Sequence, residues 1–549
     1  MIDDLWYKNA VIYCLDVKTY VDGNGDGIGD FNGLTRRLDY LAGLGVTCIW
    51  LQPFYPSPNK DNGYDVSDYY GVHPDAGTFG EYVEFMNHAR QLGLRVIVDL
   101  VVNHTSDQHA WFRDACKDAE SSSYRDWYVW SKKRPRDYKS GMVFPGVQKT
   151  TWSLDKQSRE YYFHRFYEFQ PDLDTCHPEV RREILRIMGF WLQLGVSGFR
   201  MDAVPFLVER KGVRKTHRKD YELLHEMRDF LQWRQGDAVL LAEANVPPDE
   251  SMDYFGEQGD RLQLMLNFPV NQRLFYALAS GDIKPLVEAL HATYRRPQAA
   301  QWVNFLRSHD ELDLGRLTEA QRQRVFQEFG KNKTDQLYNR GIRRRLAAML
   351  DNDRRKIEFA MSLLFTLPGT PMLQYGDEIG IGDDLSLPER MAARTPMQWS
   401  ADKHGGFTTA AKPVRPVVSD PVFGYQRVNV EAQRRDPDSL LNWTERAIRM
   451  RKECPEISWG DWRILPTKAA EVLVMRYIWQ DHALVIVHNF SDKPRAIELK
   501  ADTVGDRMMV NLLKQDDSRA DRRGRHHIEL DAYNYRWFRV GGIGHTVPR

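Results

Sequence analysis

The stretch RVIVDLVVNH, residues 95–104, decides the fold class, because an unbroken apolar run ends there in polar side chains. A strand covered by helices on both faces is continuously apolar, whereas a half-exposed strand alternates apolar and polar residues. Similar runs recur along the chain, and apolar residues repeat at helical spacing between them. The predicted strands are 11–17, 48–53, 95–101, 198–203, 239–245, 264–270, 302–308 and 371–378.

The alternation of strands and helices predicts an α/β fold around a parallel sheet. The predicted strands match in number those that close a (β/α)8 TIM barrel. A doubly wound open sheet is the alternative, but no glycine-rich phosphate loop follows the first predicted strand. We therefore predict the barrel.

The spacing of the strands also predicts insertions and a second domain. Residues 105–170, rich in tryptophan, should form a subdomain that overhangs the barrel mouth, and residues 311–355 should form a helical insertion. Short alternating runs near the C-terminus predict a β-sandwich. The expected division is 1–104 and 171–460 for the barrel, 105–170 for the inserted subdomain and 461–549 for the C-terminal domain.

Composition excludes several classes of protein. Lysine plus arginine and aspartate plus glutamate each number 76, so the net charge gives no attraction to nucleic acid or anionic lipid. No apolar run reaches the roughly 18 residues that span a membrane. The start is acidic and then aromatic, unlike a secretory signal. Five scattered cysteines without CxxC spacing indicate neither disulfides nor zinc. We expect a cytoplasmic protein, with the oligomeric state open and a homo-oligomer one option.

Ionisable residues follow several predicted strands, and the C-terminal ends of barrel strands all open on one face. A buried carboxylate costs several kcal/mol unless it is paired, so repeated acids after apolar runs indicate a shared site. Paired carboxylates with arginine and histidine, without metal-ligand spacing, fit glycoside chemistry. The residues are Asp99, Asn103, His104, Arg200, Asp202, Glu243, His309, Asp310 and Glu311.

Over nearly its whole length the chain resembles the α-amylase family of glycoside hydrolases. The resemblance implies that Asp202 is the nucleophile, Glu243 the general acid/base and Asp310 a carboxylate that binds sugar hydroxyls. No organic cofactor is implied. The segments that carry it include DNGYDVSDYYGVHP (61–74), DLVVNHTSDQH (99–109), GFRMDAV (198–204), LLAEAN (240–245), LRSHDEL (306–312) and RTPMQWS (394–400).

The proposed roles make physical demands on the acids. Asp202 must be ionised, and Arg200, two residues away on the same strand face, is expected to keep the Asp202 pKa low. Glu243 must start protonated, so its pKa should be raised. If configuration is retained, the two carboxyl groups should lie about 5–5.5 Å apart.

The resemblance also implies a dead-end pocket for one terminal glucose. His104 and His309 would bind its hydroxyls, while Asp61, Tyr64 and Arg394 would close its non-reducing end, with Tyr64 as the stacking platform. The substrate would be a small α-glucoside.

Within the family, the chain is most similar to the trehalose-synthase group, which isomerises maltose to trehalose. GIRRRLAAMLDNDRRKIE (341–358) supports this. Asn245 and Glu311 agree with the group, whereas Phe206 replaces a usual tyrosine and VPPDE follows Asn245. Hydrolysis or transfer of terminal α-glucose is therefore the alternative. A non-catalytic binding protein is the other class, but it should have lost one of the three acids.

The loop DGNGDGIGD, residues 22–30, predicts a structural Ca²⁺ site. Hard oxygen ligands at alternate positions suit this ion, and the resembled group commonly binds it here. An acidic glycine-rich turn without metal is the alternative. The expected ligands are Asp22, Asn24, Asp26, the carbonyl of Ile28, and Asp30.

Overall fold

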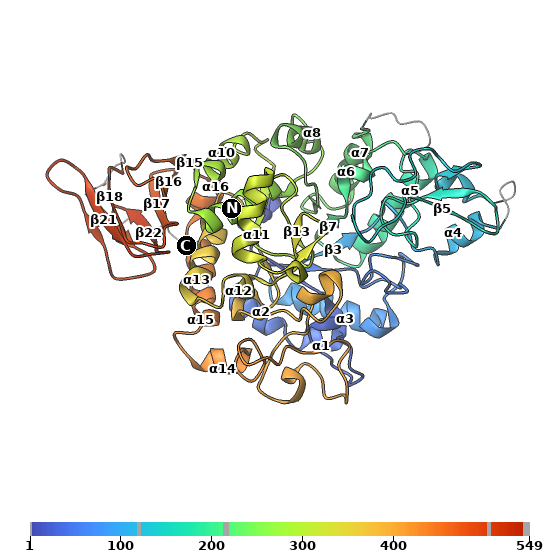
Figure 1. Cartoon of the computed structure of the whole chain (residues 1–549), viewed down its shortest axis with the longest axis horizontal. Coiled ribbons are helices and arrows are strands. Elements are labelled where there is room, and N and C mark those ends of the chain that lie inside the picture. Colours follow the sequence, from blue (N-terminus) through green and yellow to red (C-terminus); the bar gives the residue numbers. More distant parts are fainter. Residues whose placement is uncertain (1–2, 118–121, 212–218, 502–506, 542–549) are drawn as a thin grey trace.

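The structure is a computed structural model that describes residues 3–117, 122–211, 219–501 and 507–541. The barrel occupies the middle of the molecule (Figure 1). The C-terminal strands lie at one end and the inserted subdomain that contains β5 lies at the other. The long axis of the molecule therefore runs through three parts.

Eight parallel strands close into a barrel, as predicted, and the open sheet is excluded. Closure is made by β1 against β14, where Ile12 pairs with Met372. The polar residues after the strands lie beyond the ladders, at the mouth. In barrel order the strands are β1 (Ile12–Leu15), β2 (Cys48–Leu51), β3 (Arg95–Leu100), β7 (Gly198–Met201), β8 (Val239–Ala242), β9 (Leu264–Leu266), β10 (Gln301–Phe305) and β14 (Thr370–Gln374).

Helices between the strands bury one apolar stripe each. In α5, His177 caps the first turn, Pro178 occupies the position where its missing N–H costs nothing, and Ile184 and Trp191 are among the buried residues. The main helices around the barrel are α2 (Leu38–Leu44), α3 (Phe79–Gln91), α5 (Pro178–Gln193), α7 (Glu222–Arg234), α9 (Phe268–Ser280), α10 (Lys284–Ala292), α13 (Arg354–Thr366) and α15 (Leu440–Lys452).

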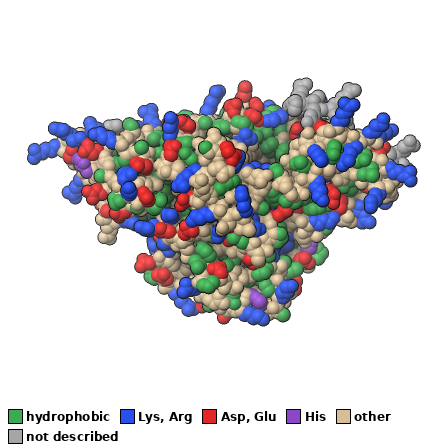
Figure 2. Space-filling model, in the orientation of Figure 1, with side chains coloured by type: hydrophobic (Ala, Val, Ile, Leu, Met, Phe, Trp, Pro, Cys, Tyr) green, Lys and Arg blue, Asp and Glu red, His purple; other side chains and the backbone are tan. Residues whose placement is uncertain are grey.

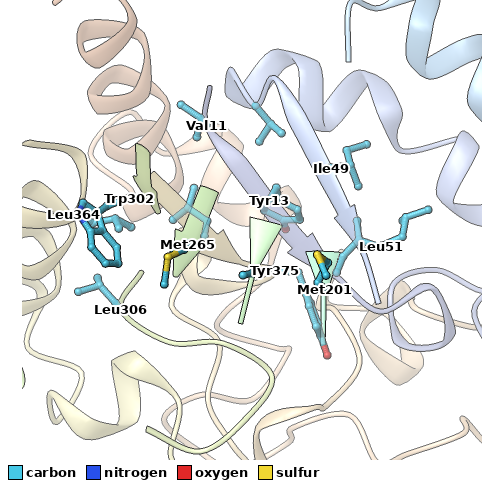
Figure 3. Close-up of a cluster of buried hydrophobic side chains, with 14 of the residues drawn as sticks. Val11, Tyr13, Ile49, Leu51, Met201, Met265, Trp302, Leu306, Leu364 and Tyr375 are labelled. Carbon is cyan, nitrogen blue, oxygen red and sulfur yellow. The ribbon is translucent and has the colours of Figure 1, made fainter. Parts of the chain in front are cut away.

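Alternate residues of each barrel strand enter two different cores. Tyr13, Ile49 and Met201 belong to the large core shown in Figure 3, which also includes residues of the surrounding helices such as Leu364. Cys14 and Trp50 belong to a smaller core with Leu264, Val303 and Met372. Side chains therefore fill the barrel interior.

The first insertion contains a small antiparallel sheet and a short helix. The strands lie in the order β4 (Trp130–Ser131), β6 (Tyr161–Phe163) and β5 (Trp152–Leu154), and α4 spans Ala110–Ala115. Val129, Trp152 and Phe163 form its own apolar cluster. This cluster lets the insertion hold a shape of its own beside the barrel mouth.

The second insertion is only partly helical, so the prediction for 311–355 is wrong in its middle part. Helix α11 spans Glu319–Phe329 and α12 spans Leu346–Met349. Between them, the chain turns back at Tyr338 and Asn339, which both have positive φ, and forms short strands. The small sheet has the order β11 (Leu312–Asp313), β13 (Gly341–Ile342) and β12 (Gln336–Leu337).

The C-terminal region has the predicted antiparallel strands. A two-stranded sheet, β18 (Arg495–Leu499) with β21 (His526–Leu530), shares an apolar core with a larger sheet, as in a sandwich. The order of the larger sheet is β15 (Asp461–Ile464), β16 (Val472–Trp479), β17 (His482–Asn489), β22 (Tyr535–Val540), β19 (Met508–Asn511) and β20 (Ser518–Arg519).

The surface carries both charge signs. Basic and acidic side chains are interspersed on the face shown in Figure 2, as expected for zero net charge. Among the described residues, no helix combines the length and apolarity needed to cross a bilayer. The cytoplasmic location and the oligomeric state stay predictions.

A buried lysine ties the inserted subdomain to the barrel. The side chain of Lys211 is 1% exposed, and its Nζ lies 2.9 Å from an oxygen of Asp172, which is fully buried. The same ammonium donates to the Asn103 side chain at 2.7 Å and to the Leu173 carbonyl at 3.0 Å. Asn103 lies just before the insertion, and Asp172 and Leu173 lie just after it, so one charge holds the two ends of the insertion together.

We expect Lys211→Met to lower the free energy of unfolding by about 3–5 kcal/mol, because it leaves a buried carboxylate without its counter-charge. Urea unfolding followed by tryptophan fluorescence measures the change. The matched control is Lys60→Met, since Lys60 forms a more exposed pair with Asp107 at 3.0 Å and should cost about 1 kcal/mol or less. Equal losses in the two variants would contradict the structural role of Lys211.

Candidate active site

The C-terminal ends of the barrel strands surround a cavity of about 460 Å³. Most of the predicted site residues line it, although they come from positions between 61 and 311 of the chain. The exceptions are Asp99 and Asn103, and Arg394, which binds Asp310. The predicted residues in the wall are Asp61, Tyr64, His104, Arg200, Asp202, Phe206, Glu243, Asn245, His309, Asp310 and Glu311.

Arg200 on β7 is the centre of the site. One nitrogen, Nη1, lies 2.7 Å from Asp99 Oδ1 and 2.6 Å from Asp202 Oδ1. The other, Nη2, lies 2.5 Å from Glu243 Oε2. The guanidinium thus binds carboxylates that follow or end β3, β7 and β8, three neighbouring strands. Asp202 and Glu243 therefore bind the same cation. The distance between their two carboxyl groups stays a prediction.

Burial raises the pKa of both proposed catalytic acids. The pKa of Glu243 rises to about 7, mainly by desolvation, and Asp202 and Asp310 add to the rise. This confirms the predicted direction for an acid that starts protonated. For Asp202 the predicted direction is wrong: its pKa rises to about 6 because desolvation outweighs the lowering by Arg200. Asp202 is still ionised in most molecules at neutral pH.

Asp310 has the opposite environment. Arg390 Nη1 and Arg394 Nη2 lie 2.7 Å and 3.0 Å from its Oδ1, and His309 Nε2 lies 3.1 Å from its Oδ2. These groups hold the Asp310 pKa well below its usual range, although burial opposes them. Asp310 is therefore a fixed anion, suited to accepting hydrogen bonds from sugar hydroxyls.

Tyr64 and His309 form a paired wall of the pocket. Their rings stack at 5.5 Å between centroids with an interplanar angle of 9°. The Tyr64 hydroxyl lies 2.8 Å from His309 Nε2 and donates to Asp99 Oδ2 at 3.2 Å. His104 is held differently, because its Nε2 lies 3.0 Å from the Tyr64 carbonyl. To bind a sugar hydroxyl through Nε2, His104 would have to give up its contact with the Tyr64 carbonyl.

The sequence did not identify Arg390 or Gln170 as site residues. Arg390 Nη2 lies 3.2 Å from Asp61 Oδ1, and the same side chain binds Asp310, so it links two walls of the pocket. Gln170 donates to the other oxygen of Asp61 at 3.0 Å. Gln170 lies in the segment QPDLD (170–174) and Arg390 in LPERMAARTPM (387–397), and no spacing rule assigns either side chain a role.

Three further predicted residues, Phe206, Asn245 and Glu311, also line the cavity. Phe206 packs edge-to-face on Phe166 of the insertion, with ring centroids 5.6 Å apart. Asn245 accepts from Arg316 Nε at 2.8 Å. Burial raises the pKa of Glu311 to about 7. This wall therefore combines aromatic surface with a protonatable carboxyl group.

The five predicted calcium ligands have the right chemistry, since all supply oxygen. In the structure, the carboxylates of the loop accept the loop's own amides: Asp22 accepts from Gly25 and Gly27, and Asp30 from Gly23. Both oxygens of Asp22 and Oδ2 of Asp30 already accept two hydrogen bonds each, so a cation would have to replace some of these bonds. Among the described residues, however, no group of three or more Asp, Glu, His or Cys side chains is arranged so that it could hold a metal ion. Calcium binding stays a prediction.

Comparisons with known proteins agree with this geometry. The family model described as alpha amylase, catalytic domain, matches residues 15–460. A sucrose hydrolase-like C-terminal domain matches residues 482–539. Both matches fall on the parts that the structure separates as barrel and C-terminal strands.

Individual relatives are similar over nearly the whole chain. Trehalose synthase from Pimelobacter is 39% identical over 552 residues, which cover 97% of this chain and 96% of the relative. Trehalose synthase/amylase TreS from Mycobacterium tuberculosis is 42% identical over 507 residues, 90% of this chain and 84% of the relative. The solved trehalulose synthase MutB from Pseudomonas mesoacidophila is 26% identical, with a TM-score of 0.76 over 97% of this chain and 99% of that one.

The pKa values of the two acids predict a bell-shaped pH profile of kcat/KM. Activity should fall below about pH 6, where Asp202 becomes protonated, and above about pH 7, where Glu243 loses its proton. Initial rates with maltose from pH 4.5 to 9 measure both limbs. With a nitrophenyl α-glucoside, whose leaving group needs no proton, only the alkaline limb should flatten. A flat profile for maltose would contradict both assignments.

Proposed function

Because the chain belongs to the α-amylase family, we propose that it isomerises maltose to trehalose through a glucosyl-Asp202 intermediate, with some hydrolysis. The single observation that carries the chemistry is the guanidinium of Arg200, which holds Asp202 and Glu243 on adjacent strands at the cavity floor. The similarity to trehalose synthases over nearly the full chain supports the choice of reaction.

In the first step, the Asp202 carboxylate attacks the anomeric carbon of the terminal glucose. The bond from that carbon to the bridging oxygen breaks, and Glu243 gives its proton to the departing oxygen. The products are a glucosyl-Asp202 ester and free glucose in the cavity. The raised pKa of Glu243 keeps the required proton available near neutral pH.

In the second step, the released glucose turns and presents its anomeric hydroxyl. Glu243, now ionised, takes the proton of that hydroxyl. The hydroxyl oxygen attacks the anomeric carbon of the bound glucosyl group, and the ester bond to Asp202 breaks. Two inversions retain the α configuration of the transferred glucose, and attack by the α anomer of the released glucose gives the α,α-linked disaccharide. If water attacks instead, the product is glucose.

The isomerisation therefore needs a closed mouth that retains glucose and excludes water. Three segments meet there. The ring of Phe144, from the first insertion, packs on Tyr338 of the second at 4.9 Å, and Arg390 lies over Phe144 at 5.0 Å. Arg340 donates to the Val143 carbonyl at 2.8 Å. These contacts support a lid formed by both insertions.

Hydrolysis or transfer to another acceptor is the alternative function. The departures around Phe206 and after Asn245 lie on the wall that would hold the second sugar, and Val246 and Glu250 line the same cavity. The relative from Mycobacterium tuberculosis carries both names, synthase and amylase. The balance between the reactions must therefore be measured.

Incubation with maltose should yield trehalose with a minor amount of glucose, and trehalose should yield maltose. Chromatography of the products over time measures this. Addition of ¹³C-labelled glucose to the maltose reaction should leave the trehalose mostly unlabelled, because the released glucose stays in the closed cavity. Maltose that yields glucose alone at all times would replace the synthase with an α-glucosidase.

The matched control for this assay is Asp202→Ala, which removes the nucleophile and should abolish both product formation and hydrolysis. Retained turnover would overturn the covalent mechanism in either function.

We also propose that the loop of residues 22–30 binds a structural Ca²⁺, from its oxygen donors and the family resemblance. Chelator treatment should then lower the thermal midpoint of the protein, and added Ca²⁺ should restore it. Elemental analysis measures the bound metal. The control Asp26→Asn should weaken the effect of Ca²⁺, whereas a protein without calcium that is insensitive to chelator would contradict the site.

A further inference from the structure

A second cleft, separate from the catalytic cavity, has a volume of about 850 Å³. Its walls come from Arg37, just before α2, from residues 399–409, and from α14 (Val430–Arg435). Helices α2 and α14 both lie in the lower half of Figure 1. None of the residues assigned to the reaction lines this cleft.

The guanidinium of Arg37 is fixed on the wall of this cleft by a buried ring. It lies over Trp399 at 4.3 Å from the ring centroid. Trp399 is itself held, because its Nε1 donates to the Tyr20 carbonyl at 2.8 Å and its ring packs edge-to-face on Tyr20 and Tyr40. The arginine is therefore oriented without a carboxylate partner.

A second arginine lies close by. Arg434 on α14 lies over the ring of Tyr40 at 5.1 Å. Burial, and to a smaller extent the neighbouring Arg434, lower the pKa of Arg37. Within the described parts of the chain, no ion pair is found for Arg37, Arg434 or Lys403, whereas Arg435, the fourth cation of the cleft, has one.

The acidic residues of the cleft already have partners. Glu431 pairs with Arg435 one turn along α14, and Asp402 accepts from the Ser400 hydroxyl at 2.8 Å. Asp22 accepts from Gly25 and Gly27 of its own loop. Four basic and three acidic side chains line the cleft, so its net charge is positive, and in the part of the chain that the structure describes Arg37, Arg434 and Lys403 lie without an ion pair beside a hollow large enough for a small molecule.

We propose that this cleft binds a phosphate-bearing small molecule. Arginine guanidinium groups bind phosphate oxygens in pairs of parallel hydrogen bonds, and a phosphate dianion can balance more than one cation, which a single carboxylate cannot. Arg37 and Arg434 would bind the phosphate, and the remaining volume would hold the group that carries it. The proposal is independent of the reaction proposed for the catalytic cavity.

Isothermal titration of the full chain with inorganic phosphate, and separately with a hexose 6-phosphate, tests the site at constant ionic strength. We expect saturable binding of both, tighter for the hexose phosphate. Arg434→Gln should weaken it about tenfold, the size expected for loss of a charge-assisted hydrogen bond. Saturable binding of hexose phosphate alone would still support the site, with the sugar required.

The matched control is Arg435→Gln, since Arg435 lines the same cleft but is paired with Glu431. It should change the affinity less than about twofold, as removal of an exposed pair does. Arg37→Gln should weaken binding as Arg434→Gln does, and a thermal scan shows whether each variant folds. All three variants should keep the wild-type turnover of maltose. No saturable binding, or binding unchanged in the Arg37→Gln/Arg434→Gln double variant, would overturn the proposal.

Discussion

The buried guanidinium of Arg200 is the interaction on which the site depends. It is 1% exposed and contacts three carboxylates, from Asp99, Asp202 and Glu243. Such a cluster is stable in a low-dielectric interior only with a counter-charge. The barrel supplies the geometry, because Arg200 pairs in register with Asp99 on β3 and with Leu241 on β8. The order of the strands in the barrel therefore also determines which charges pair.

The same cation leaves its partners with different chemistry, since burial and neighbouring charges differ around them. Burial, and then the charges of two other acids, raise the pKa of Glu243, so that it keeps a proton near neutral pH. Asp310 pairs instead with Arg390, which it shares with Asp61, and with Arg394, and it stays ionised. Environment, more than residue type, therefore distinguishes the carboxyl groups proposed as nucleophile and proton donor from the fixed anion Asp310.

Much of this could be predicted from the sequence, because continuous apolar runs mark the barrel strands and the acids directly follow them. The small sheet at 336–342 escaped prediction, since its strands are too short to show a period. Arg390 escaped because its partners Asp61 and Asp310 lie far away in the chain. The pKa of Asp202 was misjudged because a sequence shows a neighbouring arginine but not the depth of burial.

The link that Arg390 makes between Asp61 and Asp310 has a consequence for biosynthesis. The first of these residues leaves the ribosome more than three hundred positions before the last. Strand β1 also waits for β14 before the ring can close. A growing chain shorter than about 390 residues therefore has no complete sugar pocket. At roughly 5–20 residues per second, Asp61 waits about 16–66 seconds for its cation.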